Sequence, residues 1–190
     1  DVEIEVNGLM TYDRGVNKID VPRAVEAARK LYLPPPRIEP LLPTSQQQPQ
    51  TWKHTIQQPA DDWFQPDFAD DSWLAGPGGF GTPQTPGAII GTKWDTPDIW
   101  IRRTFTLDAL PAAGAVSLSI HHDEDAEVYI NGQLVKTFKG YTTSYSVVPL
   151  GPDAIRSLRT GENTLAIHCR QTGGGQYIDA GRSLVLEVSQ

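Results

Sequence analysis

A chain of 190 residues with a formal net charge of −7 is long enough to bury one core of ordinary size without disulfides or metals. The 16 Lys and Arg residues are scattered, which argues against a nucleic-acid partner, and no apolar run approaches the roughly 20 residues that cross a bilayer. We therefore expect neither nucleic acid nor membrane as a partner. Five Trp, 17 Gly and 16 Pro, with few helical patterns, are typical of a turn-rich β protein.

Residues 1–33 differ in pattern from the rest of the chain. Val2, Ile4 and Val6 alternate with acidic residues, which predicts a short extended run. A helix is expected to begin after Asp20, which can cap it, and to end at the three prolines 34–36. One helix and one extended run cannot bury themselves, so this segment is expected to dock on another domain. The chain starts without Met and has no signal peptide, as expected for a piece of a longer protein.

The remainder divides into a linker and a β domain. Residues 34–50 are rich in Pro and Gln, which predicts an extended linker. Residues 51–190 carry short strand patterns at regular spacing, predicted at 51–57, 99–107, 115–122, 126–130, 133–138, 143–148, 163–170 and 183–189. One helical turn is expected at residues 152–158. The predicted fold is all-β: a galactose-binding-like jelly-roll β-sandwich, preceded by a short extended segment and one helix of another domain.

Two local patterns support the sandwich. Asn131-Gly132 lies between two apolar runs, which is the strongest hairpin signal in the chain. Residues 61–97 form a Gly-, Pro- and Asp-rich stretch that is too long for a plain loop and is expected to be held down by Trp63, Trp73 and Trp94.

The sequence His-His-Asp-Glu-Asp at 121–125 is the only cluster that resembles a metal or acid–base site. Neighbouring residues of a strand point to opposite faces, so His121 and His122 cannot both bind one ion without a bend. A polar strand end is one interpretation. Contact of the carboxylates with calcium or a ligand is the other, with Asp123 and Asp125 as candidates. We predict no cofactor beyond this calcium ion.

The tryptophans also leave two interpretations open. An exposed aromatic face can pack on the apolar face of a sugar ring, with polar neighbours bonding its hydroxyl groups. Trp63 and Trp73 are expected in the core, whereas Trp94 and Trp100, near Asp98, are candidates for ligand contact. The glycines 173–175 predict a surface loop at the end of the sandwich that could cover a ligand.

Nothing in the sequence identifies a catalytic residue. Cys169 follows His168, but neighbours on a strand point apart, and Cys169 is expected to face the core. The 23 acidic residues include no motif that marks a pair for glycoside hydrolysis.

The order of motifs resembles a galactose-binding-like β-sandwich domain of glycoside hydrolases, notably family 2. The motifs are DDSW with a Gly-rich sequel at 70–81, WIRRTF at 100–105, an acidic turn before VYING at 128–132, and GENTLA at 161–166. The resemblance covers about residues 50–190. It implies the fold more than the ligand, since some such domains are structural and others bind carbohydrate.

Residues 1–33 carry a second resemblance. GLMTYDRGVNK at 8–18, followed by PRAVEAARKLY, is similar to the end of the TIM-barrel catalytic domain of family 2 β-galactosidases and β-glucuronidases. If so, the catalytic residues lie upstream, and an upstream catalytic domain is a partner within the parent protein. The family and its polymeric substrates imply a secreted or periplasmic location.

Three functions follow as hypotheses. The first is a non-catalytic accessory domain that binds carbohydrate or positions substrate, with candidate contacts Trp94, Asp98, Trp100, Arg102, Tyr141, Gln176 and Tyr177. The second is a structural domain that buttresses the barrel or mediates oligomer contacts, which predicts that Trp94 and Trp100 are buried with no pocket between them. The third is a hydrolase, which predicts a cleft with two carboxylates, one with a raised pKa.

Overall fold

The computed structural model describes residues 10–13, 16–19, 25, 37–111 and 116–186. It separates into two compact units, residues 1–36 with 187–190 and residues 37–186. In the first unit, β1 (Met10–Asp13) and β2 (Val16–Ile19) form an antiparallel hairpin. The extended run expected at residues 2–6 lies outside the described residues, and so does the helix expected after Asp20, apart from Val25.

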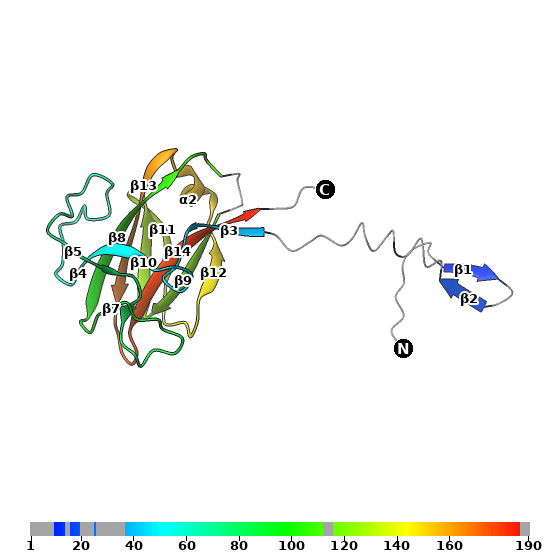
Figure 1. The fold of residues 1–190 in the computed structure, drawn as a ribbon, viewed down its shortest axis with the longest axis horizontal. Coiled ribbons are helices and arrows are strands. Elements are labelled where there is room, and N and C mark those ends of the chain that lie inside the picture. Colours follow the sequence, from blue (N-terminus) through cyan, green and yellow to red (C-terminus); the bar gives the residue numbers. More distant parts are fainter. Residues whose placement is uncertain (1–9, 14–15, 20–24, 26–36, 112–115, 187–190) are drawn as a thin grey trace. The chain divides into compact units, whose positions relative to one another are not determined.

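The second unit is an all-β sandwich, as predicted (Figure 1). The first sheet has the order β11-β10-β13-β8-β4-β5, formed by Gln133–Phe138, Asp125–Ile130, Gly161–Arg170, Asp98–Leu107, Thr51–Thr55 and Leu74–Pro77. The second sheet has the order β12-β9-β14-β6-β7, formed by Ser146–Pro149, Val116–Asp123, Tyr177–Leu186, Phe80–Gly81 and Thr92–Lys93, and β3 (Arg37–Leu42) also pairs with β14. The helix α2 (Pro152–Arg156) falls within the predicted helical turn.

Alternation along the strands places the core between the sheets. In β9, Leu118 and Ile120 lie two residues apart on the face that points inward, and both are fully buried. Ile101 of β8 and Ile167 of β13 contribute from the opposite sheet. Trp52 also belongs to this core. The two apolar sheet faces therefore bury one another.

The hairpin predicted at Asn131-Gly132 is confirmed. β10 and β11 pair antiparallel, with Ile130 opposite Gln133. Asn131 and Gly132 have φ values of +49° and +85°, the two positive angles that a two-residue type I′ turn requires.

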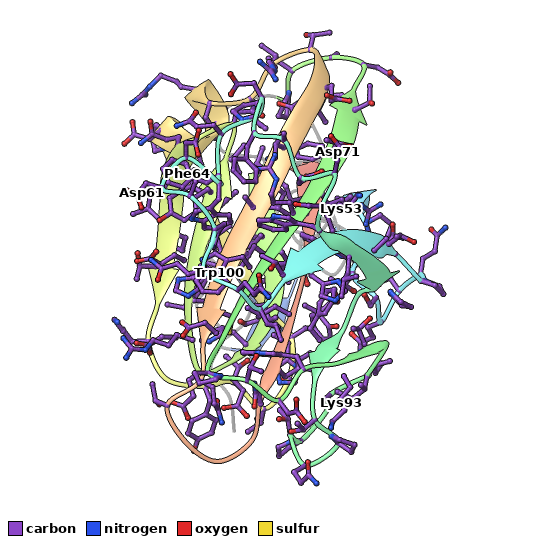
Figure 2. The ribbon with its side chains drawn as sticks, turned by 90° about the vertical axis from the view of Figure 1, so that its left-hand side faces the viewer. Lys53, Asp61, Phe64, Asp71, Lys93 and Trp100 are labelled. Atoms are coloured by element: carbon purple, nitrogen blue, oxygen red, sulfur yellow. The ribbon has the colours of Figure 1, made fainter. Side chains whose placement is uncertain are left out.

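A second, smaller cluster covers the outer face of the first sheet. Trp63 and Trp73 are buried there with Trp100 and Ala166, so the prediction that these two tryptophans lie in a core is confirmed. In Figure 2, the loop that carries Asp61, Phe64 and Asp71 lies over the strand that carries Trp100.

Two boundary predictions were wrong. The stretch 34–50 was expected to be a linker, but Arg37–Leu42 form β3, which is hydrogen-bonded to β14. Pro40 disguised this strand. It is tolerated because, among the residues that the structure describes, β3 pairs only with β14, and the ladder is irregular nearby. The last strand was expected at 183–189, but β14 begins at Tyr177. The polar residues Asp179 and Arg182 broke the apolar pattern there, although both side chains are buried.

No helix in the described part of the chain has both the length and the apolar character needed to cross a bilayer.

Candidate functional site

The two tryptophans proposed as ligand contacts are both buried. Trp94 is 1% exposed, and its Nε1 donates to Thr96 Oγ1 at 3.0 Å and to the Asp98 carbonyl oxygen at 3.2 Å. Trp100 is 8% exposed and stacks on His168, with 4.7 Å between ring centroids. Neither ring offers a free face, which is what the structural hypothesis predicts.

Asp98 and Arg102 are also engaged within the protein. Asp98 Oδ1 accepts a hydrogen bond from His168 Nε2 at 2.8 Å, which fixes the imidazole over Trp100. The buried guanidinium of Arg102 pairs with Asp70, Nε to Oδ2, at 2.9 Å and also donates to the backbone carbonyl oxygens of Trp63 and Gln65. Arg102 therefore holds on the sheet the loop of residues 61–73, which we call the aromatic loop.

Gln176 and Tyr177 anchor loops at one end of the sandwich. Gln176 Nε2 donates to the Thr96 carbonyl oxygen at 2.6 Å, and Tyr177 Oη donates to the Ile89 carbonyl oxygen at 3.2 Å. Burial, together with the nearby Asp179 carboxylate, raises the pKa of Tyr177 to about 12. Both side chains are buried, so they shape the loops rather than reaching solvent.

Tyr141 is the most exposed of the candidate contacts. Its side chain is 68% exposed, and its backbone forms an isolated bridge with Asp123. It borders a cavity of about 220 Å³, which we call the loop-end pocket; the lining residues are Gln84, Pro86, Asp123, Glu124, Tyr141 and residues 173–175. The pocket thus combines an exposed aromatic ring with two carboxylates, an amide and a glycine loop.

Hydrogen bonds fix the two carboxylates of this pocket. Thr85 Oγ1 donates to Asp123 Oδ2 at 3.2 Å, and Thr172 Oγ1 donates to Glu124 Oε2. Burial raises the pKa of Asp123; the Thr85 bond lowers it, the Glu124 charge raises it and His122 lowers it. Ionised carboxylates accept hydrogen bonds, so both can receive donors from a hydroxylated ligand.

Close packing positions the glycine loop against Asp123. A Cβ atom on Gly175 would lie 2.5 Å from Asp123 Oδ2 and 2.6 Å from Thr85 Oγ1. Thr85 Oγ1 also accepts a hydrogen bond from the Gln176 backbone nitrogen at 2.6 Å. Only glycine allows the loop to approach the acidic turn this closely.

Asp123 and Asp125, the candidate calcium ligands, are engaged by different partners. Asp125 Oδ2 pairs with Lys139 Nζ at 2.7 Å, and its Oδ1 accepts from the Gly140 backbone nitrogen at 2.9 Å. These two bonds lower the pKa of Asp125. Across the described residues, no three His, Cys, Asp or Glu side chains gather as metal ligands.

A second cavity of about 150 Å³ begins at Asp125, just after the acidic turn, and lies on the outer face of the first sheet. We call it the strand-face pocket; the residues that line it are Asp125, Ala126, Glu127, residues 137–139, His168 and Arg170. Glu127 accepts a hydrogen bond from Tyr129 Oη at 2.9 Å, and burial together with this carboxylate raises the pKa of Tyr129 to about 12.

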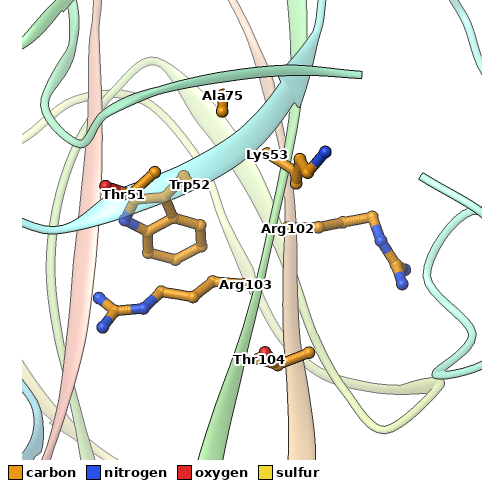
Figure 3. Close-up of a pocket in the computed structure, with 7 residues that line it drawn as sticks. All are labelled: Thr51, Trp52, Lys53, Ala75, Arg102, Arg103 and Thr104. Carbon is orange, nitrogen blue, oxygen red and sulfur yellow. The ribbon is translucent and has the colours of Figure 1, made fainter. Parts of the chain in front are cut away.

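A third cavity, of about 200 Å³, opens where β4 and β8 diverge beyond Lys53 and Arg102 (Figure 3). Arg102 and Arg103 point to opposite sides of β8, and Trp52 lies on the side of Arg103. Trp52 is fully buried, so this cleft offers no open aromatic face, and Asp70 already neutralises Arg102. The loop-end pocket suits a sugar ring better.

The only cysteine is unsuited to nucleophilic chemistry. Cys169 is completely buried, as predicted, and burial raises the pKa of its thiol. The thiolate, which is the reactive form, is therefore disfavoured.

Three residues of the loop-end region were not predicted from the sequence, namely Gln84, Thr85 and Pro86. All three lie about 40 residues before the acidic turn, in a stretch without periodicity. The pairing of β14 with both β6 and β9 brings them together. The acidic cluster at 121–125 and the glycines 173–175 were the signals that marked this end of the sandwich.

No family model matches the chain, and no curated protein matches it by sequence. Solved structures share its fold. A family 2 glycosyl hydrolase from Bacteroides cellulosilyticus aligns with a TM-score of 0.51 and 16% identity, over 70% of this chain and 20% of its own. A β-glucuronidase from an uncultured Clostridium species aligns with a TM-score of 0.51 and 13% identity, over 82% of this chain and 31% of its own.

The chain therefore spans a fifth to a third of the solved proteins that it resembles. At these identities the likeness establishes the fold and leaves the activity open. The all-β sandwich of residues 37–186 is one that occurs within family 2 glycosyl hydrolases.

Proposed function

We propose that this sandwich is a non-catalytic accessory domain of a glycoside hydrolase, and that it binds carbohydrate at the loop-end pocket. The observation that carries the proposal is Tyr141, an exposed aromatic ring beside a pocket with two fixed carboxylates. A pyranose can place its apolar face on the tyrosine while its hydroxyl groups donate to Asp123 and Glu124. The fold shared with family 2 glycosyl hydrolases supports the parent enzyme class.

The proposal extends to the parent protein. Residues 1–33 then belong to an upstream catalytic domain, and the parent is secreted or periplasmic, where polymeric glycans are met. We propose no cofactor, and no nucleic-acid or membrane partner.

The positions of the two carboxylates in the chain favour binding over hydrolysis. Asp123 and Glu124 share a pocket, and the pKa of Asp123 is raised, which meets part of the expectation for a hydrolase. They are, however, consecutive residues of one turn, whereas hydrolysis uses carboxyl groups that flank the scissile bond. Release of reducing sugar by the chain, abolished in Glu124→Gln, would show that the domain is catalytic.

Affinity electrophoresis of the 190-residue chain in gels containing galactan, xyloglucan, mannan or polygalacturonate tests the proposal. Retardation in at least one gel is expected, and Tyr141→Ala should weaken the affinity about tenfold, because it removes the stacking ring. Leu134→Ala is the matched control, since Leu134 is also an exposed apolar residue but does not line the pocket. Normal mobility in every gel, or equal loss in both variants, would refute carbohydrate binding at this pocket.

The burial of Trp94 and Trp100 favours a second candidate, a structural domain that buttresses the catalytic domain or mediates oligomer contacts. It predicts that the chain binds none of the glycans. It also predicts that Tyr141→Ala leaves all mobilities unchanged.

A further inference from the structure

The loop-end pocket and the strand-face pocket lie on either side of one short turn. We propose that they are two subsites of a single surface, which takes a linear, uncharged glycan of at least two linked sugar units. This inference rests on the proposed function, because the loop-end pocket supplies the first subsite.

Three chain segments line both pockets. Residues 123–125, 139–141 and 170–175 each contribute to the loop-end pocket at one end and to the strand-face pocket at the other. Because consecutive Cα atoms are 3.8 Å apart, those of Lys139 and Tyr141 are separated by roughly 7 Å at most. A ligand of two linked rings can therefore reach residues on both sides.

The turn between the pockets is held rigidly. His122 Nδ1 donates to the carbonyl oxygens of Glu124 at 2.7 Å and Gly140 at 3.0 Å. Asp125 binds the Gly140 nitrogen and Lys139 from the other side. The pockets therefore do not merge into one cavity, and the surface suits one sugar unit on each side of the turn.

The charges of the two pockets indicate the class of sugar. Among the described residues, the loop-end pocket is lined by two carboxylates and by no basic side chain. The strand-face pocket balances Asp125 and Glu127 with Lys139 and Arg170. An acidic sugar would be repelled at the first subsite, whereas a neutral sugar can donate hydroxyl protons to the carboxylates and accept from Lys139 and Arg170.

Calorimetric titration of the 190-residue chain with neutral oligosaccharides of one to six units tests the inference. The series is prepared by partial hydrolysis of the polysaccharide that retards the chain most. Affinity should rise about tenfold or more between one and three units and then level off, since a second subsite of ordinary quality contributes about that factor. An oligosaccharide of equal length that carries uronic acids should bind more weakly.

Arg170→Ala should abolish the gain with length and leave the affinity for one unit unchanged. Lys139→Ala, at a mostly exposed side chain, gives a second probe of the same subsite. Arg156→Ala is the matched control, because it removes an exposed arginine from α2, outside both pockets.

The outcomes separate the two claims. Equal affinity for all lengths, or equal loss at all lengths in Arg170→Ala, would overturn the two-subsite inference while leaving binding at Tyr141 intact. Failure of every glycan to bind would overturn the proposed function and the inference with it.

Discussion

The indole of Trp100 and the imidazole of His168 lie parallel, with ring centroids 4.7 Å apart and an interplanar angle of 1°. The two residues are partners in the β8–β13 ladder, so the stack continues the strand register into the side chains. Asp98, two residues before Trp100 on the same strand, fixes the imidazole through a hydrogen bond. The ring that the sequence offers as a sugar contact is instead covered by protein.

Trp100→Ala should therefore act on stability. Truncation of a buried tryptophan in a packed cluster with Trp63 and Trp73 should lower the free energy of unfolding by about 3–5 kcal/mol. Urea denaturation followed by far-UV circular dichroism measures this loss. Unchanged stability would mean that the aromatic loop does not pack on Trp100 in solution.

Arg102→Met should destabilise the aromatic loop. The change leaves the Asp70 carboxylate and the carbonyl oxygens of Trp63 and Gln65 without their donor. The guanidinium is buried but the Asp70 carboxylate is 27% exposed, so the cost should lie below the roughly 3–5 kcal/mol of breaking a fully buried pair. Urea denaturation should show the loss, and limited proteolysis should show earlier cleavage within residues 57–73.

The control for Arg102 is Lys139→Ala, which breaks an ion pair whose lysine is 79% exposed. Its effect should be far smaller, because solvent screens an exposed pair. Comparable losses in the two variants would contradict the anchoring role of Arg102.

Two buried histidines should make the sandwich less stable in mild acid. Burial lowers the pKa of His54 and of His121 below the ordinary value of 6.5, so the unfolded chain binds protons at a pH where the folded chain does not. The stability present above pH 6.5 is then lost as the pH falls below that value. Melting temperatures measured from pH 8 to pH 5 should decrease.

The double variant His54→Gln/His121→Gln separates this effect from the carboxyl groups. Burial raises the pKa of Asp179, which contributes in the opposite direction, because that stability is present at low pH and is lost as the pH rises. The difference in melting temperature between variant and parent at pH 8 measures the packing cost of the substitutions. The change in that difference toward pH 5 measures the effect of histidine protonation. A difference that is constant with pH would rule out the histidines as the source.

Gly175→Ala should weaken carbohydrate binding at the loop-end pocket. The added methyl group would clash with Asp123 Oδ2 and Thr85 Oγ1, so the carboxylate must leave its position. Gly151→Ala is the control, because a Cβ atom there meets nothing within 4 Å. Calorimetry with the retarding glycan should show reduced affinity in the first variant alone, and equal affinities would contradict the role assigned to Asp123.

The sequence predicted the structure correctly where a local backbone conformation requires particular residue types. Asn131-Gly132 predicts a hairpin because both positions need positive φ, and the alternation in β9 predicts which residues face inward. It failed where tertiary contacts override the local pattern. Pro40 is typical of a linker, yet β3 tolerates it where the ladder with β14 is irregular.

The candidate site was likewise predictable only in part. The acidic cluster at 121–125 marked one end of the sandwich, but nothing local shows that Gln84 and Pro86 close the same pocket. Trp100 and Arg102 looked available because the exposure of a strand residue depends on which loop folds over the strand. That loop is held by contacts between residues more than 30 positions apart, as between Asp70 and Arg102.

The pairing of β3 with β14 determines where this domain can be cut from a longer protein or inserted into another. A truncation that starts at residue 50, as the sequence suggests, would remove β3 and leave the adjacent edge of β14 unpaired from Arg182 to Leu186. Unpaired strand edges of this kind recruit other chains and favour aggregation. A transferable version of the domain must begin at or before Arg37.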